Sequence, residues 1–211
     1  MGEGDVLGWF TRKVYRLRTG DLRVRGTSVV LLTTERLVLR EFEPEDWVAL
    51  NAIESRPEVA RYQSFAPQTP AESQAYVLET IQSAAGHPRL TYDLAVILTS
   101  EDRLIGRCGL GLGDGEPREA VLWYTLHPDE WGRGYTTEAA RALVDFGFRT
   151  LGLHRIWADC DPRNTASWRV LEKIGMRREG HLRENAWVKR EWVDSLIYAI
   201  LDREWPVSSG G

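Results

Sequence analysis

Two glycines that flank one arginine stand between an apolar run and a helical stretch. The sequence Trp-Gly-Arg-Gly-Tyr-Thr of residues 131–136 follows the apolar residues 121–126 and precedes a helix expected over residues 138–151. Glycine lets the backbone approach a ligand without a Cβ in the way. The first amides of a helix have no partner within it and lie at its positive end. The pattern therefore predicts an anion site suited to phosphate, with Arg133 as an additional positive charge.

This turn is not specific by itself, because glycine turns are also plain tight connections between a strand and a helix. It lacks the Gly-Lys-Ser/Thr of a Walker loop and the third glycine of a dinucleotide-binding fingerprint. A second stretch, residues 161–167, contributes an Asn-x-x-Ser pattern at Asn164 and Ser167. A short helix over residues 167–173, ended by Gly175, is expected to follow it.

The two stretches resemble the acetyl-CoA site of the GNAT superfamily of N-acetyltransferases. Within it they most resemble the RimJ/RimL-like branch, which includes ribosomal-protein N-terminal acetyltransferases. The superfamily pattern Gln/Arg-x-x-Gly-x-Gly/Ala falls on Trp131, Gly134 and Thr136, and only the glycine matches strictly. The resemblance continues through residues 33–40, 153–156 and 179–180, and it covers roughly residues 32 to 203.

The resemblance implies where acetyl-CoA binds. In relatives the pantetheine arm pairs with an exposed strand edge, and main-chain hydrogen bonds supply the affinity. The implied cofactor-binding residues lie on that edge, in the glycine turn and in the Asn-x-x-Ser stretch: Tyr124, Thr125, Leu126, Trp131, Gly132, Arg133, Gly134, Tyr135, Thr136, Asn164 and Ser167. A helix N-cap is the alternative role of Asn164.

Acetyl transfer is the attack of a neutral amine on a thioester, and the resemblance implies two catalytic groups for it. A backbone amide near Leu126 is the implied donor to the oxyanion, worth about 3 kcal/mol in comparable sites. Ser167 is the implied proton donor to the leaving thiolate. The alternative is that Ser167 is an ordinary helix serine.

The general base stays open between three residues. Some relatives place a glutamate where this chain has Ala186, and Glu184 lies on the same strand face if the alternation holds. Glu119 matches another family position, but it precedes Tyr124 by roughly 16 Å of straight strand and needs a water relay or a bulge. His127 is the third candidate, because its ordinary pKa is suited to the task.

The elements that position these residues follow from apolar periodicity and turn residues. Strands are expected at 36–40, 92–98, 104–112, 120–126, 155–160, 177–188 and 192–201, and helices at 138–151, 167–173, from Pro44, and from Pro70 to Gly86. The strand-helix-strand order over residues 120–160 implies a right-handed parallel crossover. We expect an α/β (α+β) fold like that of GNAT enzymes. Its centre is a mixed, mostly antiparallel twisted sheet of about seven strands, flanked by about four helices and splayed between strands 4 and 5.

Residues 1–31 form a basic N-terminal extension with a possible hairpin, residues 32–205 the GNAT domain, and residues 206–211 a loose tail. Basic residues of such a hairpin can protect a sheet edge. They can also contact an acidic partner such as RNA, which would make the extension a ribosome contact. The resemblance does not decide between these roles.

Composition restricts the remaining options. The net charge of −4 argues against broad nucleic-acid binding, and no apolar run reaches the length of a membrane span. Two cysteines, Cys108 and Cys160, cannot build a disulfide framework or a metal cluster, and a cytoplasmic location is expected. The expected partner is an amine acceptor, either a peptide N-terminus or a small molecule of the aminoglycoside type. A silent acyl-CoA-binding module is the alternative to an enzyme, and a homodimer is common in the resembling branch.

Overall fold

The computed structural model describes residues 29–112 and 118–206 of the chain. The strands are β1 (Leu31–Thr33), β2 (Leu37–Arg40), β3 (Thr91–Leu98), β4 (Arg103–Leu112), β5 (Glu119–Leu126), β6 (Arg155–Cys160), β7 (Arg177–Val188) and β8 (Glu191–Leu201). The helices are α2 (Trp47–Glu54), α3 (Pro57–Ala60), α4 (Pro70–Ala84), α5 (Tyr135–Arg149) and α6 (Thr165–Lys173), with 3-10 turns η1 (Pro44–Asp46), η2 (Pro128–Glu130) and η3 (Asp202–Glu204). The predicted N-terminal hairpin, the turn at 113–117 and most of the C-terminal tail lie outside the described residues.

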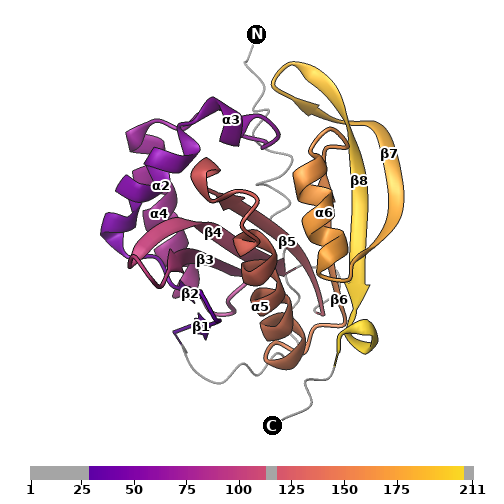
Figure 1. Ribbon diagram of the computed structural model, residues 1–211, viewed down its shortest axis with the longest axis horizontal. Coiled ribbons are helices and arrows are strands. Elements are labelled where there is room, and N and C mark those ends of the chain that lie inside the picture. The colour runs from indigo at the N-terminus through magenta and orange to yellow at the C-terminus, as the bar shows by residue number, and fades with distance from the viewer. Residues whose placement is uncertain (1–28, 113–117, 207–211) are drawn as a thin grey trace.

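The strands form one eight-stranded sheet in the order β1-β2-β3-β4-β5-β6-β8-β7 (Figure 1). Every neighbouring pair is antiparallel except β5 and β6, which are parallel, so the expected mixed, mostly antiparallel sheet is confirmed. The sheet has one strand more than the sequence predicted. Strand β1 pairs Leu31 with Arg40, and it is too short to show an alternating pattern.

Helices cover both faces of the sheet and enclose two apolar cores (Figure 1). On one face α2 and α4 pack against β3 and β4 through Leu50, Ile53 and Val77. On the other face α5 packs against β4 and β5 through Leu143 and Val144, beside α6. The sheet is thus a rigid platform between two layers of helices.

The parallel pair β5 and β6 separates soon after it begins. The two strands pair at Glu119 with Arg155, at Ala120 with Ile156 and at Val121 with Trp157. Beyond these residues β5 continues along β4 as far as Leu126, while β6 continues along β8. The predicted splay is therefore confirmed, and it leaves the second half of β5 with one free edge.

Local sequence explains where two of the helices begin. Thr69 and Glu72 form a capping box at the start of α4, and Pro70 occupies the first helical position. Helix α5 begins at Tyr135, earlier than predicted, because Gly134 adopts the left-handed conformation (φ 85°) that ends the preceding loop. In the described ranges, no helix is long and apolar enough to cross a membrane.

Candidate active site

The free edge of β5 presents backbone groups of the predicted cofactor residues. The amide of His127 donates to the carbonyl of Ile105 (2.8 Å), and Gly106 lies opposite Leu126. Bonding alternates along an antiparallel pair, so Leu126 and Tyr124 direct their N–H and C=O groups away from β4. Because β6 has already diverged, these groups face the gap between the two strands.

Thr125 is placed differently from its two neighbours. It pairs with Arg107 of β4, so its backbone groups belong to the β4–β5 ladder. Its side chain is buried on the opposite face of the sheet from Tyr124. The free edge therefore consists of Tyr124 and Leu126, with Thr125 supporting it from behind.

The glycine turn ends in an uncapped helix. Gly132 (φ 76°) and Gly134 (φ 85°) are both left-handed and exposed. Gly134 is the N-cap of α5 and supplies no side-chain acceptor, so within the described residues the amides of Tyr135, Thr136 and Thr137 have no hydrogen-bond partner. A row of free amides at the positive end of a helix fits a pyrophosphate.

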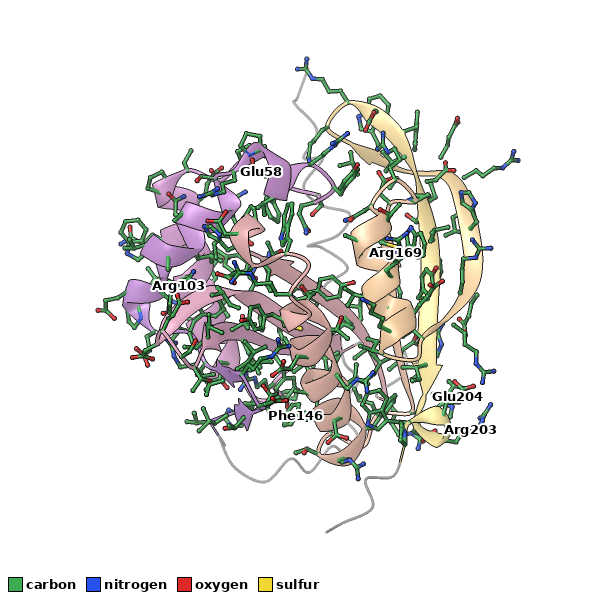
Figure 2. All side chains as sticks on the ribbon, viewed as in Figure 1. Glu58, Arg103, Phe146, Arg169, Arg203 and Glu204 are labelled. Atoms are coloured by element: carbon green, nitrogen blue, oxygen red, sulfur yellow. The ribbon has the colours of Figure 1, made fainter. Side chains whose placement is uncertain are left out.

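Two side chains connect this turn with its surroundings. Trp131 is 49% exposed and donates its indole N–H to the carbonyl of Leu126 (2.9 Å), which fixes the turn to the end of β5. Arg133 is more than half exposed and pairs with the buried Glu130 at 3.3 Å. Arg169 is exposed on α6 (Figure 2).

Ser167 meets the free edge of β5 across the gap. The Tyr124 hydroxyl lies 3.0 Å from both the Oγ and the carbonyl oxygen of Ser167. The Cys160 thiol of β6 also hydrogen-bonds with Ser167, and burial raises the pKa of that thiol to about 12. Burial likewise raises the pKa of Tyr124. The serine therefore lies where the two diverging strands and α6 meet, beside a tyrosine that stays protonated at neutral pH.

Asn164 is the N-cap of α6, the alternative role that the sequence left open. Its Oδ1 accepts a hydrogen bond from the amide of Ser167 (3.2 Å). This bond fixes the first turn of the helix and hence the position of Ser167. The amide nitrogen of the same side chain remains available to a ligand.

Neither glutamate proposed as general base lies on the free edge. Glu119 stands where β5 and β6 are still paired, and it forms an ion pair with Arg155. The register between β4 and β5 runs without a shift from Gly106 to Leu112, so no bulge brings Glu119 closer to Tyr124.

Glu184 lies on the outermost strand of the sheet. It is exposed, has a left-handed backbone (φ 46°) and donates its amide to Asp194 (2.8 Å). The pairing of β7 with β8 shifts between Leu182 and Ala186, so the alternation that related Glu184 to Ala186 does not hold there. The third candidate, His127, directly follows Leu126, and its Nδ1 accepts the amide of Asp129 (3.2 Å).

A buried charged network was missed by the sequence analysis. Arg107 of β4 donates to Glu54 (2.7 Å), Tyr76 (2.8 Å) and Asp93 (3.3 Å), and Tyr76 donates to Asp93. These residues lie on the face of the sheet that α2 and α4 cover, where Thr125 is the neighbour of Arg107. The signal in the sequence was an arginine within the otherwise apolar segment 104–112.

The link between α3 and α4 contacts the tip of the β7–β8 hairpin. Lys189 at the tip donates its ammonium to the carbonyls of Ala60 and Arg61, where α3 ends. Arg61 also lies over the ring of Tyr62, 5.1 Å from its centroid. The hairpin tip and the link therefore lie side by side.

Known proteins match this chain over the fold and the site. A family model described as an acetyltransferase (GNAT) domain matches residues 36–177. The uncharacterized N-acetyltransferase YnaD of Bacillus subtilis is 38% identical over 174 residues, 82% of this chain and 98% of that relative. The crystal structure of a GNAT-family acetyltransferase from Bacillus anthracis matches with a TM-score of 0.75 and 34% identity, covering 83% of this chain and 100% of that chain.

A relative with a named acceptor matches a shorter part of the chain. The ribosomal protein uS5-alanine N-acetyltransferase of Escherichia coli is 29% identical over 91 residues, 43% of this chain and 47% of that relative. The resemblance to ribosomal-protein N-acetyltransferases is thereby confirmed. The predicted N-acetyltransferase activity and the predicted cofactor, the acetyl-CoA that GNAT acetyltransferases use, are confirmed as well. The chain belongs to the GNAT acetyltransferase family.

Proposed function

We propose that this N-acetyltransferase acts on the α-amine of a protein or peptide N-terminus. The glycine turn and the first amides of α5 hold the pyrophosphate, and the backbone N–H and C=O of Tyr124 pair with the pantetheine arm. The Leu126 carbonyl accepts the Trp131 indole N–H, which leaves the Leu126 N–H for the acetyl end of the cofactor. Acetyl-CoA supplies the activated acetyl thioester. Asn164 is a further contact for the arm through its free amide nitrogen.

Two groups of this chain act on the reacting atoms. The Leu126 N–H, aimed into the gap between β5 and β6, stabilises the negative charge that develops on the thioester oxygen. As the amine nitrogen bonds to the acetyl carbon, the carbon–sulfur bond breaks and Ser167 gives its proton to the departing sulfur. The proton lost by the amine leaves through water or through one of the candidate bases, Glu119, Glu184 or His127.

The observation that carries the choice of acceptor is the lack of a base on the free edge. Among the described residues, the hydrogen bonds of Tyr124, Leu126 and Ser167 involve no carboxylate. An α-amine has a pKa near 8 and is partly neutral without help, whereas a lysine side chain, near 10.4, needs a base. The site therefore favours an α-amine.

The resemblance implies that the acceptor binds at the link between α3 and α4, and the charge of that surface supports the same choice over a polycationic amine. Lys189 and Arg61 bring positive charge to the link between α3 and α4. The carboxylates nearest to them in the sequence, Glu58 and Glu191, pair with Arg56 and Arg163. An aminoglycoside or a polyamine would meet cations here. The Escherichia coli relative, named as a ribosomal protein uS5-alanine N-acetyltransferase, agrees with this proposal.

The acceptor is tested by following free thiol release from acetyl-CoA. The panel holds peptides with different N-terminal residues, the same peptides with a blocked N-terminus and an internal lysine, spermidine, and kanamycin. We expect turnover on free N-termini and its loss on blocking. Turnover confined to blocked lysine peptides or small amines would contradict the proposal, and binding of acetyl-CoA without any turnover would favour a silent module.

The glycine turn is tested by Gly134→Ala, which we expect to raise the Kd of acetyl-CoA about tenfold, equivalent to ~1.4 kcal/mol. The new methyl group disfavours the left-handed backbone that places the amides. Gly152→Ala is the matched control, since Gly152 is also left-handed (φ 67°), follows α5 and has no atom within 4 Å of the place that a Cβ would take. Calorimetric titration should show weakened binding for Gly134→Ala alone. Equal Kd values for the two variants would remove the turn from the cofactor site.

A further inference from the structure

Arg36, in the turn between β1 and β2, holds the glycine turn at several points. Its Nη1 donates to the carbonyl of Arg133 (3.1 Å), and its guanidinium lies over the ring of Tyr135, 4.5 Å from the centroid. Its Nε donates to Glu138 in the first turn of α5 (2.7 Å). One side chain thus ties together the loop and the helix whose amides face the ligand.

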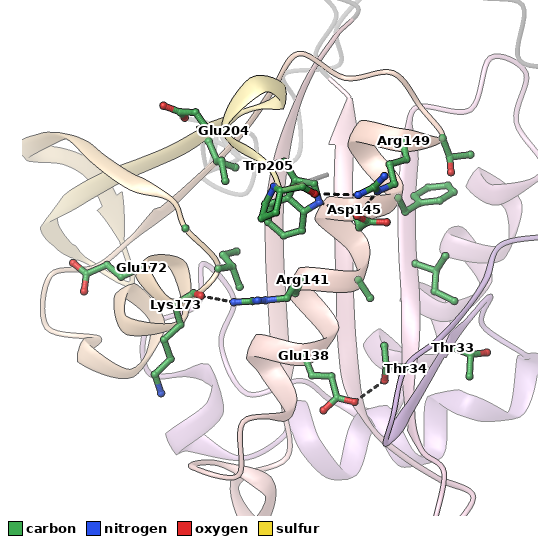
Figure 3. A pocket seen from close by; sticks show the side chains of 18 of the residues that line it. Thr33, Thr34, Glu138, Arg141, Asp145, Arg149, Glu172, Lys173, Glu204 and Trp205 are labelled. Carbon is green, nitrogen blue, oxygen red and sulfur yellow. Dashed lines mark hydrogen bonds and ion pairs between the residues drawn. The ribbon is translucent and has the colours of Figure 1, made fainter. Parts of the chain in front are cut away.

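The turn between β1 and β2 also binds Glu138 directly. One of its carboxylate oxygens accepts the Thr34 hydroxyl (2.6 Å) and the backbone amide of Arg36 (2.9 Å). Figure 3 shows the contact between Thr34 and Glu138 at one end of a groove of about 880 Å³ along α5. Lys173 and Arg141, which line the groove further along, are joined to each other by a hydrogen bond. None of the predicted site residues lines this groove. Glu138 connects it with the glycine turn in two ways, through Arg36 and through its own amide, which donates to the carbonyl of Gly134 (3.0 Å).

The bond to the Arg133 carbonyl controls the direction of a neighbouring amide. A trans peptide is planar, and its C=O and N–H groups point in opposite directions. Because Arg36 binds the carbonyl of Arg133, the N–H of Gly134 must point away from Arg36. The conformation of the turn is therefore set by a residue that precedes it by 97 positions.

The second effect of Arg36 is electrostatic. Burial opposes the charge of Glu138, but hydrogen bonds from Thr34 and Arg36 outweigh burial and lower its pKa, so the carboxylate is ionised at neutral pH. A carboxylate in the first turn of α5 repels a pyrophosphate bound at the same helix end. The guanidinium of Arg36, 2.6 Å from Glu138, cancels that charge.

We propose that Arg36 is a positioning residue for the pyrophosphate of acetyl-CoA, acting by fixing the glycine turn and by neutralising Glu138. The proposal rests on the glycine turn being the pyrophosphate site. This role accounts for the contacts that the partly exposed Arg36 makes with three residues in and after the glycine turn, Arg133, Tyr135 and Glu138. The same role gives a function in cofactor binding to the segment Thr34-Glu35-Arg36, which lies in the N-terminal stretch that resembles the GNAT family.

The test measures the Kd of coenzyme A for the full chain by calorimetry, below the melting temperature of every variant. Arg36→Met is expected to weaken binding about 10- to 30-fold, because it frees the turn and exposes the Glu138 charge. Arg36→Lys, which keeps the charge but cannot span both partners, should lie in between. Arg36→Met combined with Glu138→Gln should regain about fivefold over Arg36→Met, since the repelling charge is gone.

Arg40→Met, at the end of the adjoining strand β2, is the matched control. Arg40 pairs with Asp46 at 2.6 Å and is partly buried like Arg36, but it makes no contact with the turn. It should lower the melting temperature and leave the Kd of coenzyme A within about twofold. Recovery of coenzyme A affinity in the variant with Arg36→Met and Glu138→Gln separates a cofactor role from lost stability. If the Arg36–Glu138 pair only stabilised the fold, the second substitution would not restore affinity.

Three outcomes would overturn the proposal, and Gly134→Ala tells the first two apart. If Gly134→Ala weakens binding of coenzyme A while Arg36→Met does not, the turn remains the cofactor site and Arg36 has no part in it. If neither variant weakens binding, the pyrophosphate lies elsewhere and both assignments fail. An equal loss in Arg40→Met and Arg36→Met would reduce the effect to stability.

Discussion

Replacing Arg107 with methionine is expected to lower the free energy of unfolding by about 3–5 kcal/mol, the cost of leaving buried charges without a partner. Arg107 is 7% exposed, and Glu54 and Asp93 are 3% exposed each. Methionine fills much of the volume of the arginine stem but offers no donor. Two carboxylates would then remain in the interior with only the Tyr76 hydroxyl between them. Urea denaturation followed by fluorescence measures the loss.

The charge balance of this network makes the effect large. Burial opposes the charge of Arg107, but Tyr76, Glu54 and Asp93 outweigh it and raise the pKa of the guanidinium. Burial raises the pKa of the Tyr76 hydroxyl, which therefore stays a donor to Asp93. One oxygen of Asp93 already lacks a hydrogen-bond partner among the described residues. Among the described residues, the network therefore has no spare donor to replace Arg107.

Arg163→Met is the matched control for Arg107→Met. Arg163 also joins two carboxylates, Asp161 at 2.6 Å and Glu191 at 2.9 Å, but its side chain is 54% exposed. Water replaces the lost contacts there, so the expected loss is at most about 1 kcal/mol. Equal losses in the two variants, or an Arg107→Met protein as stable as the unmodified chain, would show that the network does not hold this face of the sheet.

The features that sequence predicted are those that depend on neighbours along the chain. The glycine turn is followed by its helix, β7 and β8 form the closing pair of strands, and Asn164 has the N-cap role that the sequence left as an alternative. Each of these features depends on the spacing of residues within one segment, and the family resemblance predicted the order of the segments along the chain. The splay followed from the same resemblance.

What sequence did not predict depends on contacts between distant segments. Arg107 meets Glu54, Tyr76 and Asp93 across 53, 31 and 14 positions, and no local pattern distinguishes these residues from surface charges. The placement of Glu184 was missed for a different reason. A bulge in β7 leaves the two residues Leu182 and Ala186 opposite Ser195 and Val193, so counting by twos along the strand fails.

Ser167 is the residue that we propose as the proton donor to the leaving thiolate. The resemblance implied its role from the Asn-x-x-Ser pattern alone. The structure places its hydroxyl 3.0 Å from that of Tyr124, on the edge where the thioester is proposed to lie. Since burial keeps Tyr124 protonated, its hydroxyl can donate a hydrogen bond to the Ser167 oxygen while that serine gives its proton to the sulfur, and water then restores the serine proton.

Ser167→Ala is accordingly expected to lower kcat about 100-fold, the lower end of the contribution of general acid–base catalysis. The Kd of acetyl-CoA should stay within about threefold, because the backbone contacts of β5 and the glycine turn are unchanged. Tyr124→Phe, which removes only the partner hydroxyl, should cost about tenfold in kcat. Steady-state kinetics on the best acceptor of the panel measures each value.

Thr165→Ala tests whether the loss of kcat in Ser167→Ala depends on the position of the hydroxyl that is removed. Thr165 is the other hydroxyl residue of the same helix turn, but it is exposed. The kcat of the Thr165→Ala variant should therefore stay close to that of the unmodified enzyme. If Ser167→Ala retains full turnover, or if Thr165→Ala loses as much, Ser167 is not the proton donor. The leaving thiolate must then take its proton from water that enters between β5 and β6, and the hydroxyl pair of Tyr124 and Ser167 serves only to join α6 to the sheet.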